Sequence, residues 1–187
     1  MNDIHSQNQM MKAYVGMAMS TLIIGLSFVF VKIALRSAGP SDVLAHRFNA
    51  AVIALLLLYV TGVVRKPKLN RKQFLQLLSI SVFYPLLFFG LQTIGLQYTT
   101  ASEAGIMAAI TPVITLLLAS LLLKERNTIG QIMGVVLSVA GICYIFAKSG
   151  TSIHGNSMQG NLIILLSVFS IVFYYIFGRK INKHYRT

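Results

Sequence analysis

The feature that most constrains the fold is the apolar run Ser102–Leu123, whose only charged residue is Glu103 near its start. A helix of this length crosses a hydrocarbon layer of about 30 Å, so the run predicts a membrane span. The charged triplet Lys124-Glu125-Arg126 ends it, and a second apolar run, Thr128–Phe146, follows with Asn127 as its expected N-cap. Because the connection is so short, the two helices are expected to lie antiparallel.

Composition places the chain in one class. Of its 187 residues 56% are hydrophobic and 11% charged, which leaves too little polar surface for a soluble globule and predicts an all-α, polytopic membrane bundle. The net charge of +12 lies mostly in short loops beside the spans, so it indicates membrane topology and not nucleic-acid binding. The single cysteine, Cys143, and the scattered histidines predict no disulfide, metal site or cofactor. No catalytic motif is found, so we expect no enzyme.

Apolar runs and their breaks predict six transmembrane helices. Ser41 and Asp42 are expected to cap the second, and Asn70 with Gln73 the third. We divide the chain into a tail (1–13), a five-helix unit (14–147), an external linker (148–160) and a final segment (161–187) that begins another unit. The expected spans are about Tyr14–Ile33, Val43–Val64, Phe74–Leu96, Ser102–Leu123, Thr128–Phe146 and Asn161–Phe177.

The distribution of lysine and arginine predicts the orientation. These residues collect in the segments that follow the second, fourth and sixth spans, which places both termini in the cytoplasm. Lys32 and Arg36 fall on the outer side in this scheme, where Lys32 is long enough to snorkel to the interface. The segment before Tyr14 lacks the pattern of a cleaved signal peptide, so the first span is expected to remain as an anchor.

A short internal similarity suggests a repeat. Phe30-Val31-Lys32-Ile33, near the end of the first span, is similar to Gly178-Arg179-Lys180-Ile181 at the end of the sixth. If the sixth span begins a second copy of the first five, their odd number forces the two copies to be inverted in the membrane. Many secondary transporters are built in this way.

Several stretches, taken together in their order and spacing, resemble the EamA type of the drug/metabolite transporter superfamily. A tryptophan often precedes the glycine of the first span in that family, and Ile24 stands there in this chain. The resemblance implies two inverted five-helix repeats in a whole protein, of which this chain holds one and the first helix of the next. The stretches are Gly25–Lys32, Arg47-Phe48, Gly95–Ser102, Thr111-Pro112, Lys124–Arg126 and Gly134 with Gly141.

The resemblance implies a secondary carrier for small organic metabolites or drugs, exporting them across a bacterial cytoplasmic membrane by alternating access. The cavity would be bordered by the first four spans, and the low charge of the spans favours a neutral, zwitterionic or amphipathic solute. The expected partners are the lipid bilayer and this small-molecule substrate. The alternative is a non-transporting scaffold, or a half-transporter completed by a homodimer or by a missing C-terminal repeat.

In the fourth span a proline marks a candidate site. Pro112 has no N–H for the carbonyl of Ala108, which needs another partner or a wet cavity at membrane depth. Met107, Thr111 and Thr115 share one helix face beside this break. Their hydroxyls could bind the freed carbonyl or a substrate, or each could bond within its own helix and face a neighbouring one.

The third span carries a similar stripe of Tyr84, Phe88 and Gln92, with Pro85 as its expected kink. We assign all three stripe residues to substrate binding. Gln92 is the strongest candidate, because exposing an amide side chain to lipid is energetically unfavourable. The alternative for the aromatic residues is packing or lipid contact.

The first two spans add further candidates. Thr21 and Phe28 lie on one stripe with Lys32, and we assign the first two to substrate contact. Lys32 could meet an anionic group or snorkel. Arg47, about one turn into the second span, is costly in lipid unless paired, so it predicts either a gating role or an ion pair with Asp42.

Two further patterns remain. Thr100 and Glu103 fit a capping box, which explains Glu103 without making it a proton carrier. Gly130, Gly134 and Ser138 repeat small residues at a spacing of four, which predicts a helix contact within the bundle or between protomers.

Overall fold

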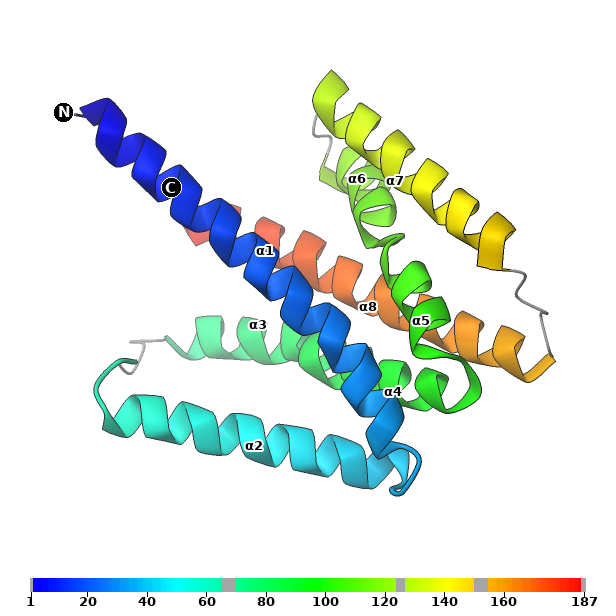
Figure 1. Cartoon of the computed structure of the whole chain (residues 1–187). Coiled ribbons are helices and arrows are strands. Elements are labelled where there is room, and N and C mark those ends of the chain that lie inside the picture. The colour runs from blue at the N-terminus through cyan, green and yellow to red at the C-terminus, as the bar shows by residue number, and fades with distance from the viewer. Residues whose placement is uncertain (1, 65–69, 124–126, 150–154, 186–187) are drawn as a thin grey trace.

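The computed structural model describes residues 2–64, 70–123, 127–149 and 155–185. The predicted basic loop at 65–69, the triplet 124–126 and the linker residues 150–154 lie outside these ranges. Every element within them is helical, which confirms the predicted fold class. The elements are α1 (Asn2–Ala34), α2 (Pro40–Val60), α3 (Arg71–Ser81), the π-helical η1 (Val82–Leu87), α4 (Phe88–Tyr98), α5 (Ala101–Ala108), α6 (Thr111–Leu123), α7 (Ile129–Ser149) and α8 (Gly155–Tyr185) (Figure 1).

The lengths of the apolar helices match the predicted spans. Within the described ranges, five are long and apolar enough to cross a membrane, and a shorter apolar helix, Ile129–Gly141, corresponds to the fifth predicted span. The third and fourth spans are each built from consecutive helices that are interrupted near a proline. The five longer spans are Met10–Ala34, Pro40–Val60, Arg71–Tyr98, Ala101–Leu123 and Met158–Ile181.

The last helix lies at the centre of the bundle. α8 packs along α4, α5 and α6, whereas α7 contacts α6 (Figure 1). The core follows this arrangement, because Leu96 of α4, Ala104 of α5 and Ile164 of α8 are fully buried together. In Figure 1 the beginning of α1 and the end of α8 point to one end of the bundle, and the turn between α1 and α2 lies at the other.

Two glycines allow α4 and α8 to cross closely. A Cβ atom added to Gly160 would lie 2.8 Å from the carbonyl oxygen of Gly95 and 2.8 Å from the backbone nitrogen of Thr99. A Cβ atom added to Gly95 would lie 2.8 Å from the side chain of Ile164. Small residues permit this approach of two backbones, which is a common way to join helices in membranes.

Some predicted helix caps are confirmed. At α3 the Asn70 side chain and Gln73 form the reciprocal bonds of a capping box. The same pair of bonds joins Thr100 and Glu103 at the start of α5. Both motifs are local, so the sequence spacing alone is enough to find them.

Two other predicted caps are wrong. α2 begins at Pro40 after Gly39, and no side chain caps it, so Ser41 and Asp42 do not serve as caps. A proline in the first turn needs no acceptor for its missing N–H and already has a helical φ. At α7, Asn127 is also not the cap, because Thr128 and Gln131 exchange the capping bonds one residue later.

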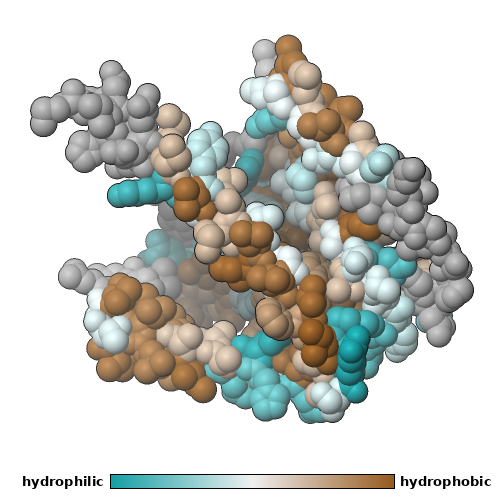
Figure 2. Space-filling model, viewed as in Figure 1, coloured by the Kyte–Doolittle hydropathy of each residue, from teal (hydrophilic) through white to brown (hydrophobic). Residues whose placement is uncertain are grey.

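Apolar side chains cover the outer surfaces of α1 and α2, as Figure 2 shows. Leu22 of α1 is 62% exposed and Leu57 of α2 is 61% exposed. Continuous apolar faces of this extent are rare on soluble monomers, and they suit contact with lipid. The same view shows a hollow between the two helices.

Candidate functional site

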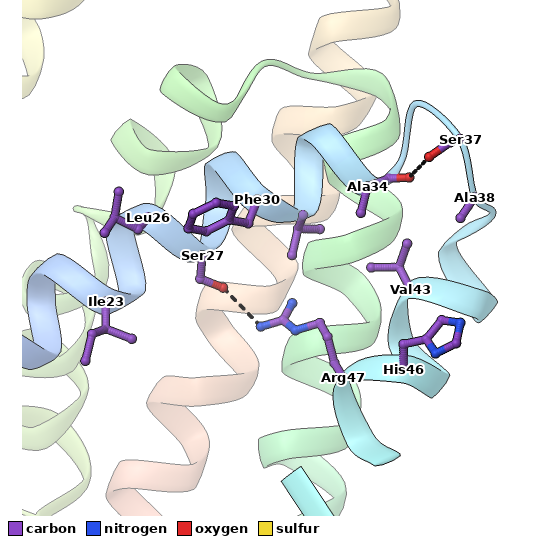
Figure 3. Close-up of a pocket in the computed structure, with 11 residues that line it drawn as sticks. Ile23, Leu26, Ser27, Phe30, Ala34, Ser37, Ala38, Val43, His46 and Arg47 are labelled. Atoms are coloured by element: carbon purple, nitrogen blue, oxygen red, sulfur yellow. Dashed lines mark hydrogen bonds between the residues drawn. The ribbon is translucent and has the colours of Figure 1, made fainter. Parts of the chain in front are cut away.

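The hollow between α1 and α2 is a cavity of about 600 Å³ (Figure 3). Its volume lies in the range of pockets that hold small organic ligands. Most of its wall is apolar, and its polar groups come from Ser27, Ser37, His46 and Arg47. The apolar lining residues are Ile23, Leu26, Phe30, Val31, Ala34, Ala38 and Val43.

Arg47 joins three helices at this cavity. Its Nη2 donates to Ser27 Oγ of α1 at 3.2 Å, and its Nη1 donates to Gln92 Oε1 of α4 at 3.5 Å. The guanidinium carbon lies 4.5 Å from the centre of the Phe89 ring, a cation–π arrangement. In Figure 3 the side chain points from α2 across the cavity toward Ser27. The described partners of this cation are therefore all neutral.

The alternative pairing of Arg47 with Asp42 does not match this geometry. Five helical positions separate the two residues, which places their side chains about 140° apart around α2. Asp42 is exposed in the first turn, while Arg47 is partly buried and turned to the other helices. The structure thus favours a role for Arg47 at the cavity.

Gln92 is 3% exposed and reaches the cavity through its bond to Arg47. Phe89 and Ser27 were missed by sequence reasoning. Ser27 lies one position from Phe28, so the stripe of α1 that faces the cavity is displaced by one residue from the predicted stripe. Phe28 itself is 5% exposed and packs in the core beside Leu96.

Tyr84 and Phe88 belong to an aromatic cluster behind Phe89. The Tyr84 ring centre lies 5.4 Å from that of Phe88, 5.3 Å from Phe89 and 5.1 Å from Tyr174 of α8. Tyr84 has a non-helical backbone (φ −143°, ψ 121°), and Pro85 follows it within η1. The proline interruption thus turns an aromatic side chain toward α8, one ring away from Arg47.

At the second proline, the freed carbonyl has a local partner. α5 ends at Ala108, and Thr111 Oγ1 donates to the Ala108 oxygen at 2.5 Å. Thr115 Oγ1 donates in the same way to the Thr111 oxygen at 2.7 Å. Both hydroxyls thus bond within their own span. Met107 packs against the core cluster.

Four other predicted residues lie away from the cavity. Thr21 is exposed and donates to the Met17 oxygen of its own helix. Gly130, Gly134 and Ser138 are exposed along α7, and a Cβ atom added to either glycine would meet nothing within 4 Å. Among the described residues, no second helix therefore packs on this stripe.

Lys32 stabilises a helix end. Its Nζ donates to the Leu96 oxygen at 2.6 Å and lies 3.4 Å from the Gln97 oxygen, in the last turn of α4. In a continuous helix the Leu96 oxygen would accept from the N–H of Thr100, four residues later. That N–H is bonded to Glu103 Oε2 instead. A cation at a helix C-terminus satisfies such carbonyls and opposes the helix dipole. This differs from the snorkelling and the anionic partner that the sequence suggested.

A buried polar junction of Thr99, Glu103 and Asn161 lies next to the end of α4. Thr99 Oγ1 is 2.5 Å from Glu103 Oε2 and 2.7 Å from Asn161 Oδ1 of α8. Glu103 is 7% exposed and Thr99 is 3% exposed. The junction connects α4, α5 and α8, and Glu103 serves there as a cap and a bridge.

Comparison with known proteins agrees with this architecture. Residues 11–147 match the EamA-like transporter family, so the chain belongs to this family and is an integral membrane protein. It is 41% identical over 180 residues to the uncharacterized transporter YcxC of Bacillus subtilis, covering 96% of this chain and 57% of that protein. An uncharacterized transporter of Archaeoglobus fulgidus is 24% identical over 176 residues, covering 94% of this chain and 60% of that protein.

A third relative, the uncharacterized transporter YetK of Bacillus subtilis, is 28% identical over 176 residues, covering 93% of this chain and 53% of that protein. The chain thus spans a little over half the length of these relatives. No solved structure matches it.

Proposed function

We propose that this protein is a secondary transporter that exports small organic metabolites or drugs across a bacterial cytoplasmic membrane by alternating access. Its family and the names of its relatives support transport in general. The observation that carries the proposal is the largely apolar cavity between α1 and α2, where Arg47 contacts Gln92. Both termini would lie in the cytoplasm, in line with the distribution of lysine and arginine.

The physical argument concerns the cost of polar groups in lipid. An ionisable side chain within a membrane span is expensive, and it is retained mainly where it faces a water-filled cavity or a solute pathway. Arg47 lies on a candidate span and reaches Ser27 and Gln92 on two others. A cluster contributed by three spans is also placed to sense their relative movement, which alternating access requires.

The test is transport by the purified protein in proteoliposomes, with a metabolite panel and with or without a pH gradient. Gln92→Ala removes the buried amide that lies beside Arg47, and we expect transport to fall about 10-fold, because this amide helps to hold the guanidinium at the cavity. Gln97→Ala is the matched control, since the Gln97 side chain is exposed. Equal rates in Gln92→Ala and the unmodified protein would remove Gln92 from the site.

The alternative proposal is a half-transporter that acts with a partner chain, or a scaffold without transport. The exposed small-residue stripe of Gly130, Gly134 and Ser138 favours it, because such stripes join helices in membranes. A folded, inserted protein that moves no member of the panel would support this alternative over the carrier.

A further inference from the structure

Among the described residues, the charge of Arg47 has no acidic counterpart at the cavity. Its bonded groups are the hydroxyl of Ser27 and the amide oxygen of Gln92, with the Phe89 ring above it. The described residues that line the cavity include no aspartate or glutamate. Of the four acids in the chain, Glu103 is bonded to Thr99 and Thr100 at the junction of α4, α5 and α8. The site therefore holds a positive charge among neutral groups.

Arg47 also keeps donors for another group. A guanidinium carries five N–H donors in a planar fork, and the two described bonds use one from each terminal nitrogen. The bond to Gln92 is long at 3.5 Å, so a stronger acceptor would displace it readily. A carboxylate matches the fork with two parallel bonds and adds the attraction of opposite charges.

The rest of the cavity selects the body of the ligand. Ile23, Leu26 and Phe30 present apolar surface beside Arg47, so an apolar chain or ring would be buried there. The lining, in the part of the chain that the structure describes, holds no acid to receive an ammonium group. A cation would meet Arg47 as a like charge, and a zwitterion would leave its amine unpaired.

We propose that the solute bound at this cavity is a small organic acid with one carboxylate and an apolar body, and that Arg47 binds the carboxylate. This inference rests on the proposed transport function and narrows its substrate to a class. His46 also lines the cavity, and in Figure 3 it lies on the side of Arg47 away from Ser27; the binding mode does not require it.

The test is binding to the purified full chain in nanodiscs of phosphatidylcholine, measured by titration calorimetry. Each probe set keeps one body and changes only its head group: phenylacetate, phenylacetamide and phenethylamine, then the equivalent sets built on indole and on a branched alkyl chain. In at least one set the carboxylate should bind about 10-fold or more tightly than the amide and the amine. Equal affinities for all head groups, or binding of no carboxylate, would overturn the proposal.

Substitutions at Arg47 test whether this residue causes the preference for a carboxylate. Arg47→Gln should abolish the preference for the carboxylate, while Arg47→Lys should keep part of it, because lysine provides a charge without the planar fork. Arg36→Gln, at an exposed position just after α1, is the matched control and should bind as the unmodified protein does. Circular dichroism and thermal unfolding confirm that each variant is folded. A preference retained in folded Arg47→Gln would contradict the assignment.

An anionic lipid offers the same chemistry from another source. Nanodiscs containing phosphatidylglycerol distinguish an anionic lipid from a soluble acid as the occupant of the cavity. If lipid is the natural occupant, phosphatidylglycerol should suppress probe binding in the unmodified protein and in Arg36→Gln alike, and this would overturn the assignment to a soluble acid. Binding that persists in both lipids supports it.

Binding and transport can fail separately. Carboxylate binding without transport in proteoliposomes would refute the proposed function and leave the site intact. Transport that treats the carboxylate and the amide alike would refute only this inference.

Discussion

The helices α1 and α8 have closely similar mean hydropathy, yet they occupy opposite environments. In the most apolar 18-residue window of α8, 39% of the residues are buried, against 11% in that of α1. Ile164 and Val172 of α8 are fully buried, whereas Leu22 and Ile23 of α1 are 62% and 63% exposed. Apolarity therefore identifies both helices as spans and does not say which lies inside.

The small and polar residues of α8 explain why it is more buried than α1. α8 presents Gly160, Asn161 and Ser167 to its neighbours, and Ser167 is only 1% exposed. Lipid tails are as apolar as leucine, so close packing and hydrogen bonds, and not hydrophobicity, draw a helix into a membrane bundle. α1 reaches the core with Phe28 and Val31, and with the ammonium group of Lys32.

The largest expected effect comes from adding one methyl group to α8 at Gly160. Gly160→Ala should lower the free energy of unfolding by about 2–3 kcal/mol, because its Cβ would collide with the backbone of Gly95 and Thr99, which cannot yield easily. Thermal unfolding in detergent and titration with a denaturing detergent measure the change.

The control for this comparison is Gly25→Ala on α1, where an added Cβ meets nothing within 4 Å. Alanine favours a helix over glycine by about 1 kcal/mol, so this variant should be neutral or slightly more stable. The two substitutions are chemically identical, yet only Gly160→Ala should lower the free energy of unfolding. A loss of stability of similar size in both would show that α1 is packed as tightly as α8.

A smaller effect is expected at the polar junction of α8. Thr99→Val keeps the shape of the side chain and removes the hydroxyl that lies against Glu103 and Asn161, at an expected cost of about 1–2 kcal/mol. The same substitution on α1, Thr21→Val, removes an exposed hydroxyl bonded to its own helix and should cost less than about 0.5 kcal/mol. Parallel unfolding titrations compare the pair; equal changes would mean that the junction contributes no specific stability.

The predictions that are confirmed rest on local interactions, although the caps predicted at Ser41, Asp42 and Asn127 show that a local pattern can also mislead. The spans follow from runs of apolar residues, and the capping boxes at Asn70 and Thr100 follow from pairs three residues apart. The interruption near Pro112 is equally local, since the Ala108 carbonyl finds its partner in Thr111 of the same span. In each case the partners lie within one helical turn.

The interactions it missed join residues that are distant in sequence. Lys32 and Leu96 are 64 positions apart, and Arg47 and Gln92 are 45 apart, so no spacing rule connects them. The sequence also could not predict which face of α1 lines the cavity. A stripe can be found from its period, but lipid and neighbouring helices are both apolar, so the pattern could not show that Ser27 and not Thr21 faces the cavity.

The smallest expected effect concerns the bond that ties α1 to α4. Lys32→Met keeps most of the apolar stem and removes the donor to the Leu96 carbonyl, which should cost about 1 kcal/mol, because the ammonium is only partly buried. Unfolding titrations measure the loss, and hydrogen exchange should show faster opening of the last turn of α4. Lys12→Met, at an exposed position on the same helix, should change neither quantity. If Lys32→Met leaves both unchanged, the bond of Lys32 to α4 contributes no stability, and the contrast between α1 and α8 becomes sharper.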